Sequence, residues 1–490
     1  MHDFKIKIHK QENDSYQITI LDCPIANHVG EFFMLTGEQI ARELKVWQKD
    51  ILPNPQQTTE DCGSINHLIS ALKTFDPQLL TLEVVQSYLD QIITEAVDML
   101  DPACRGDTSA VIRAYGLLLF NLFFRRAQNP PTDTTLKDRY RASVWAANKR
   151  LRLKLGIESP ELHNLHWECL YDLKNPWAQP FLGLSNHTFV IRGVPVESAS
   201  TLSVEGPLRV LTVFANPRTR KYPDLADEIK QEKYNLKNLE EETQGRLKFS
   251  FLDELNLEHR GTFNRIVEAM TREKPHLLYY FGHGDIDEQG GFLVGERDPS
   301  HPTNSPVDKI YGDRLVIGLL GEANEHLGLV MLNACRLAQH PGIQYQWGTG
   351  AFSDIASSLL RMGQSGRSNI AAVIAMRFNI GADTARIFTR ELLVDFSNSL
   401  WGSLYQTGDT LEEILVKARL KVFNAGNIEW LIPVLFSRSK DGRIFKLKKN
   451  PHEIFDEAKK AYLERDYAEV QRLLHEELQE FPQSTLDTLR

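Results

Sequence analysis

Apolar runs of strand length alternate with segments of helical periodicity over residues 208–396, and this alternation is the strongest constraint on how the chain folds. Strands that alternate with helices form a largely parallel sheet with helices on both faces. We therefore predict an α/β fold built on a doubly wound sheet. The expected strands are 208–214, 247–251, 276–284, 327–335 and 370–376, and the expected helices are 225–241, 262–271, 351–362 and 382–396.

Two of the apolar runs end at residues that can perform acid–base or nucleophilic chemistry, His283 and Cys335. The carboxyl ends of parallel strands meet at one edge of an open α/β sheet, so we expect these two side chains to lie close together. A cysteine beside a histidine becomes a thiolate nucleophile with its own general base. The pattern predicts attack on an acyl carbon, most often that of a peptide bond.

The oxyanion formed by such an attack needs backbone N–H donors. Gly284 directly follows the histidine and places no side chain between the backbone and a substrate. We expect the Gly284 and Cys335 amides to be the two donors. A catalytic site of this kind needs neither a metal nor an organic cofactor.

The amino-terminal part of the chain has a different pattern. Residues 4–22 alternate as two strands of a hairpin, with Asn13-Asp14 at the turn. A polar, proline-containing loop is expected at 52–66, and the pattern from 79 to 155 is mainly helical. Residues 1–150 are therefore predicted to form an α+β region, to which the sequence assigns no role.

The carboxy-terminal residues 449–490 are predicted to form two antiparallel helices that resemble a single tetratricopeptide repeat. One repeat cannot bury its own apolar face. We expect this helical hairpin to dock on the body of the protein, on a partner or on further repeats. The α/β domain lies between the two end regions, at 151–448, and 196–206 is predicted to be a linker inside it.

The amino-acid composition argues against several classes of protein. The charge of the 490 residues is 56 − 65 = −9 without a basic tract, which argues against a nucleic-acid partner. Five cysteines without a CxxC pair argue against a disulfide framework or a zinc site, and for a reducing compartment. No secretory signal core is recognisable, and the most apolar helix, 110–124, is shorter than the ~20 residues of a membrane span. We therefore expect a soluble, cytoplasmic protein.

Phe281-Gly282-His283-Gly284 and Leu332-Asn333-Ala334-Cys335 resemble the two catalytic blocks of caspase-like cysteine peptidases, which include caspases, metacaspases, separase and legumain. The separation of 335 − 283 = 52 residues is similar to the ~50 residues found in caspases. Within this group the chain most resembles the CHAT domain, a prokaryotic peptidase family often joined to tetratricopeptide repeats. Further similar blocks lie at 165–172, 206–211, 371–376 and 430–436, although His166 stands where the family usually has proline.

The resemblance implies a caspase-like fold and a cysteine endopeptidase that cleaves a protein substrate. It also implies a regulated effector in prokaryotic defence or cell death, activated by a signal or by a partner protein. Such a partner is expected to bind the amino-terminal region or the carboxy-terminal helices. The polar, glycine-containing segment 336–350 is the expected mobile substrate loop.

The resemblance also assigns a substrate-binding residue. The position two before the cysteine commonly lines the S1 pocket in these peptidases, and an acid there suits a basic P1 residue. This chain has the neutral Asn333 instead, so we expect that Asn333 alone does not select a basic P1 side chain. Asp285 and Asp354 are the candidates for supplying the negative charge.

Simpler interpretations apply to single residues. A lone histidine or cysteine at a strand end is more often structural than catalytic, and only their joint occurrence favours a dyad. His163 and His166 lack a third metal ligand and are predicted to pack or to face solvent. Two other functions stay open, a catalytically silent interaction scaffold with the CHAT fold and an acyltransferase or ligase that uses a thioester-like intermediate. Retention of both His283 and Cys335 favours the peptidase over the scaffold.

Overall fold

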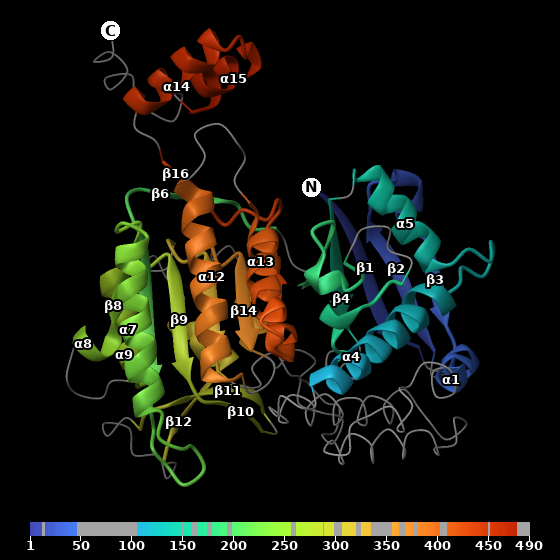
Figure 1. Ribbon diagram of the computed structural model, residues 1–490, viewed down its shortest axis with the longest axis horizontal. Coiled ribbons are helices and arrows are strands. Elements are labelled where there is room, and N and C mark those ends of the chain that lie inside the picture. The colour runs from blue at the N-terminus through green and yellow to red at the C-terminus, as the bar shows by residue number, and fades with distance from the viewer. Residues whose placement is uncertain are drawn as a thin grey trace.

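The computed structural model forms two α/β parts and a carboxy-terminal helical pair (Figure 1). It describes residues 1–11, 15–46, 105–148, 150–158, 162, 165–173, 179–193, 198–255, 261–287, 289–297, 306–319, 325–334, 355–361, 369–376, 380–401, 409–448 and 451–477. The predicted turn at Asn13-Asp14 and the predicted loop at 52–66 lie outside these ranges.

The second part has the alternation of strands and helices that the sequence predicts. Its main strands are β7 (Leu208–Ala215), β8 (Leu247–Phe251), β9 (Leu277–Gly282), β13 (Leu329–Asn333), β14 (Ala372–Met376) and β15 (Pro433–Ser437). Its main helices are α7 (Ala226–Glu242), α8 (Leu252–Leu255), α9 (Phe263–Glu273), α10 (Gly312–Gly318), α11 (Ile355–Arg361), α12 (Ala382–Trp401) and α13 (Leu411–Asn424). The neighbouring strands in the order β8-β7-β9-β13-β14 are all parallel, and only β15 runs antiparallel to its neighbour β14. The predicted fold class, a largely parallel sheet flanked by helices, is confirmed.

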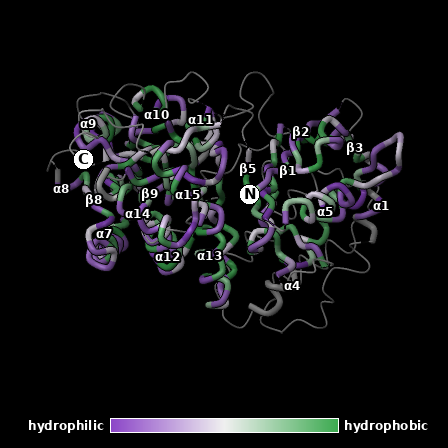
Figure 2. The backbone as a smooth tube through the Cα atoms, turned by 90° about the horizontal axis from the view of Figure 1, so that it is seen from above, coloured by the Kyte–Doolittle hydropathy of each residue, from purple (hydrophilic) through white to green (hydrophobic). Residues whose placement is uncertain are grey.

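Helices cover both faces of this sheet because the strands direct apolar side chains to each of the two faces. Helices α7, α12 and α13 lie on one face and α9, α10 and α11 on the other (Figure 2). Leu236 of α7 and Phe388 of α12 share a buried cluster with Tyr279. Ile266 of α9 shares a separate buried cluster with Tyr280, the next residue of the same strand. Successive strand residues therefore enter different cores, as the pleat requires.

The first part contains the predicted amino-terminal hairpin. β1 (His2–Lys10) pairs antiparallel with β2 (Tyr16–Asp22), which pairs with β3 (Phe32–Leu35). On its other side β1 runs parallel to β4 (Leu151–Ile157), and β4 runs parallel to β5 (Thr188–Gly193). Helices α1 (Gly37–Val46), α4 (Arg105–Phe120) and α5 (Leu136–Ala146) accompany these strands. The proposed division at residue 150 stays a prediction, and β1 and β4 hydrogen-bond across it.

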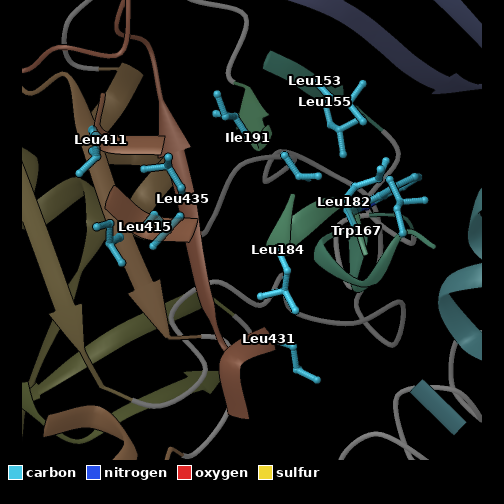
Figure 3. Packing of buried hydrophobic residues seen from close by; sticks show 14 of the residues in the cluster. Leu153, Leu155, Trp167, Leu182, Leu184, Ile191, Leu411, Leu415, Leu431 and Leu435 are labelled. Carbon is cyan, nitrogen blue, oxygen red and sulfur yellow. The ribbon is translucent and has the colours of Figure 1, made fainter. Parts of the chain in front are cut away.

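The two parts share one eleven-stranded sheet, in the order β3-β2-β1-β4-β5-β15-β14-β13-β9-β7-β8. A single residue pair, Phe436 with Arg192, connects β15 to β5 in register. Apolar side chains fill the space beside this junction and come from both parts (Figure 3). They include Leu184 from the first part and Leu431 and Leu435 from the second, all in one buried cluster.

Two small sheets were not expected from the sequence. β10 (Gly284–Asp287), β11 (Gly290–Gly295) and β12 (Asp308–Tyr311) form an antiparallel sheet directly after β9. The other joins β6 (Leu202–Val204) to β16 (Phe445–Leu447) in parallel. The predicted linker at 196–206 therefore contains a strand, because Leu202 to Val204 find backbone partners that lie far away in the sequence.

The predicted carboxy-terminal hairpin is present as α14 (Pro451–Leu463) and α15 (Tyr467–Arg472), which continues as a π-helical turn at Leu473–Glu477. A small core of Ile454, Ala458 and Leu473 holds the two helices together. The aromatic side chains Tyr462 and Tyr467 are 61% and 60% exposed and therefore contribute little to it. The tetratricopeptide assignment stays a prediction. Among the described helices, none combines the length and the apolar character that a membrane crossing requires.

Candidate active site

The carboxyl ends of β9 and β13 lie side by side, as predicted. The two strands are parallel neighbours, and Asn333 pairs with Phe281 in their register. His283 is the first residue after β9, and Ala334, the first residue after β13, is the last described residue before Cys335. Cys335, the predicted substrate loop at 336–350 and Asp354 lie outside the described residues.

The His283 imidazole is held by the segment between β7 and α7. Its Nε2 lies 2.8 Å from the main-chain oxygen of Pro223, and its ring centroid lies 5.6 Å from that of Tyr222. A carbonyl oxygen only accepts hydrogen bonds, so Nε2 is the protonated ring nitrogen. In a neutral imidazole the other nitrogen, Nδ1, then carries the lone pair and can accept a proton.

The main chain of His283 is fixed as well. Its carbonyl oxygen accepts hydrogen bonds from the Val294 amide at 3.0 Å and from the Tyr280 hydroxyl at 3.2 Å. Tyr280 comes from β9 and Val294 from β11, so the main sheet and the small sheet together set the position of the residue.

Asp285 lies two residues further along, on β10. Its Oδ2 accepts a hydrogen bond from the Tyr222 hydroxyl at 2.7 Å and lies 2.5 Å from Lys221 Nζ. The hydrogen bond with Asp285 raises the pKa of Lys221, and burial, followed by Asp285, raises the pKa of Tyr222. Both pKa shifts favour the ammonium form of Lys221 and the neutral phenol of Tyr222 at neutral pH. The predicted contact of Asp285 with substrate stays a prediction.

Asn333 is buried at the end of β13 and belongs to a chain of hydrogen bonds. Its Nδ2 donates to the Tyr279 hydroxyl at 3.1 Å, and that hydroxyl donates to Glu232 Oε1 at 2.7 Å. Burial raises the pKa of Glu232, which is 1% exposed. A carboxyl group thus lies two hydrogen bonds from the residue assigned to the S1 pocket.

The sequence analysis missed both Glu232 and Pro223. Glu232 did carry a signal, because Leu236 and Leu239 follow it at helical spacing on the buried face of α7. A carboxylate on an apolar helix face needs a partner inside the protein. Pro223 carried no signal, since its contact with His283 uses only the main-chain oxygen.

No metal site emerges in the part of the chain that the structure describes, where no three or more His, Cys, Asp or Glu side chains converge. His166 is fully buried, and its ring packs edge-on against Tyr115 at 5.7 Å between centroids. His163 lies outside the described residues. The expectation that the site needs no metal or organic cofactor stays a prediction.

Comparison with known proteins places the chain in a family. Residues 134–455, more than half of the 490, match the CHAT domain. The chain belongs to the CHAT domain family. The span of the CHAT match includes β4 and β5 of the first part as well as the whole region from β7 to β16.

The comparisons with curated proteins and with solved structures add no further family assignment. No curated protein matches the chain. A crystal structure of the Saccharomyces cerevisiae separase–securin complex is similar at 10% sequence identity with a TM-score of 0.39. The similarity covers 91% of this CHAT protein but 30% of that chain, so this chain spans less than a third of its length.

Proposed function

We propose that this CHAT protein is a cysteine endopeptidase in which Cys335 is the nucleophile and His283 the general base. The register of β9 and β13 carries the proposal. Asn333 lies opposite Phe281. Cys335 follows Asn333 by two residues, and His283 likewise follows Phe281 by two. Adjacent strands lie about 4.8 Å apart, and a trans peptide bond keeps the Cα of Cys335 about 3.8 Å from that of Ala334. Both distances are short enough for the two side chains to meet.

The state of His283 supports its role as a base. Because Nε2 is occupied by the Pro223 carbonyl, Nδ1 is the nitrogen that accepts the thiol proton. The Cys335 thiolate then attacks the scissile carbonyl carbon. Protonated His283 returns the proton to the departing amine as the C–N bond breaks, and a thioester remains. A water molecule, deprotonated by the same imidazole, hydrolyses the thioester and frees the thiol.

The Gly284 amide is a suitable oxyanion donor. The Val294 amide donates to the His283 carbonyl, and hydrogen bonds alternate along an antiparallel ladder. The N–H of Gly284, which pairs with Leu293, therefore points away from β11. β10 is an edge strand of its small sheet, so this N–H faces the side on which a substrate can approach. The Cys335 amide is the proposed second donor.

The substrate is a protein, and Asn333 contributes to the pocket for its P1 side chain, with Asp285 or Asp354 as further candidates. Activity is controlled by a partner protein or a signal, received by the amino-terminal part or by the α14–α15 pair. A role in prokaryotic defence or cell death rests on the family alone. A cytoplasmic location rests on the five scattered cysteines, which favour a reducing compartment.

The test compares wild-type protein with Cys335→Ala and His283→Gln variants. Each is incubated with cell lysate, and newly formed protein amino termini are mapped by mass spectrometry. We expect new termini with wild type and none with either variant. Equal patterns from all three proteins would refute the peptidase and favour the scaffold. Amide products formed with added amines, in place of hydrolysis, would favour the acyltransferase or ligase.

A further inference from the structure

We propose that Tyr222 is a positioning residue for His283, acting through a clasp formed by Lys221, Tyr222 and Asp285. The clasp fixes the segment before α7 on the small sheet, and thereby fixes the Pro223 carbonyl that orients the imidazole. Its catalytic consequence rests on the proposed peptidase function. Its effect on the histidine itself does not.

Tyr222 is anchored at both ends of its side chain. The ring is 7% exposed and packs in a cluster with Phe292, Val294 and Val307, which belong to or precede the strands of the small sheet. The hydroxyl donates to Asp285 Oδ2 at 2.7 Å. A buried phenol that finds no acceptor pays the desolvation cost of its hydroxyl without compensation, so this hydrogen bond selects one position for the ring.

Lys221 completes the clasp from the solvent side. Its ammonium group lies 2.5 Å from the same carboxylate oxygen, although its side chain is 69% exposed. The ammonium group compensates the charge of Asp285, which lies two residues from His283 in the sequence. An exposed ion pair contributes little stability on its own, so we assign the main effect to Tyr222.

The next residue transmits this constraint to the active site. Proline has a fixed φ near −65°, and the residue before a proline is confined to extended conformations. With Tyr222 anchored, few backbone rotations remain that could move the Pro223 oxygen. That oxygen lies 2.8 Å from His283 Nε2, and the Tyr222 ring lies beside the imidazole.

The same sheet provides a matched control. The Tyr311 hydroxyl donates to Asp287 Oδ2 at 2.8 Å, and Lys309 Nζ lies 2.7 Å from that oxygen. This second group has the same three residue types in the same small sheet. Its hydrogen-bond acceptor is Asp287, and the Tyr311 ring packs on Phe292 at 5.4 Å between centroids, against the cluster that contains Tyr222. Phenylalanine keeps this ring packing, so Tyr311→Phe removes mainly the hydrogen bond to Asp287.

The test uses full-length protein with ¹⁵N-labelled histidine. The ring signals of His283 are identified from their absence in a His283→Gln variant. Nitrogen chemical shifts report which ring nitrogen carries the proton in the neutral form. We expect wild type and Tyr311→Phe to hold the proton on Nε2, and Tyr222→Phe to show a mixture of both tautomers. Asp285→Ala is expected to behave as Tyr222→Phe, and Asp287→Ala as wild type.

Cleavage kinetics give a second readout, measured with a peptide that spans a cleavage site mapped in the lysate experiment. Positioned acid–base groups contribute about 10²–10⁴-fold to rates, and a loss of orientation is expected to remove ~10-fold or more of kcat. KM should change less than ~2-fold, because the imidazole does not bind the substrate in the ground state. Tyr311→Phe should change neither constant.

An unchanged His283 tautomer in Tyr222→Phe, or an equal change in Tyr311→Phe, would refute the proposal that the clasp positions His283. An altered tautomer with unaltered kcat would overturn its catalytic consequence. If wild type and Cys335→Ala give the same termini in the lysate experiment, the proposed function fails, and the tautomer measurement still decides whether the clasp positions His283.

Discussion

Glu168→Gln is expected to destabilise the protein by about 3–5 kcal/mol, the usual cost of removing one partner from a buried ion pair. Glu168 and Arg192 are 1% and 2% exposed. Arg192 Nε and Nη2 donate to the two carboxylate oxygens at 3.1 and 2.9 Å. Glutamine keeps the size and one oxygen acceptor, so the variant removes mainly the negative charge.

A second buried cation increases this cost. Arg419 is 1% exposed and donates to the Gly183 and Pro433 carbonyl oxygens. Burial lowers its pKa to about 10, and the Glu168 carboxylate opposes that decrease. Without this carboxylate, the buried charges of Arg192 and Arg419 would repel each other, although carbonyl oxygens still accept hydrogen bonds from both.

The assay is urea unfolding followed by tryptophan fluorescence, because buried Trp167 directly precedes Glu168. Glu38→Gln is the control, since Glu38 and Arg42 form an exposed pair that contributes at most about 1 kcal/mol. A Glu168→Met/Arg192→Met double variant should recover part of the loss, because it removes both charges of the pair but still leaves Arg419 without the Glu168 carboxylate. A loss below ~1 kcal/mol for Glu168→Gln would refute the electrostatic reasoning.

Two further predictions concern pH and specificity. Burial, and then charge interactions with Arg209 and His326, lower the pKa of His276 to about 4. The unfolded chain therefore binds more protons than the native state between about pH 4 and 6.5. Stability should fall by at most about 3 kcal/mol as pH decreases through that window, and His276→Gln should flatten this part of the curve; an unchanged slope would contradict the assignment. In a P1-varied peptide library, Asn333 should not confine cleavage to Arg or Lys, and exclusive cleavage after basic residues would show this expectation to be wrong.

The order of strands and helices in the second part was predictable because each element has its own local pattern. β7 and β9 are mainly apolar runs of strand length, and α7 and α9 have helical spacing. The hairpin of the first part was predictable for the same reason. It was not predictable that the two parts share one sheet, since pairing between distant strands depends on contacts that leave no local pattern in the sequence.

The candidate site was also predictable only in part. His283 was predicted because it ends an apolar strand, and Gly284 because it follows the histidine. Asn333 was predicted from the family resemblance, through its place two residues before the cysteine. The hydrogen bond from His283 to Pro223 spans 60 residues and uses a main-chain atom. The bond between Tyr279 and Glu232 spans 47 residues and ends on a helix of many charged side chains. Such contacts become visible only when the strands are assembled.

The junction between β5 and β15 decides how the two parts influence each other. Six residue pairs connect β4 to β5, but one connects β5 to β15. Lys154 and Arg152 add side-chain hydrogen bonds across the junction, at 3.2 and 3.4 Å from the Ser439 carbonyl oxygen. The buried cluster shared by both parts and the hydrogen bond from Arg419 to the Gly183 carbonyl oxygen also span this junction. Side-chain packing, more than strand pairing, therefore joins the two parts, and substitutions in that packing are the changes through which one part would alter the other.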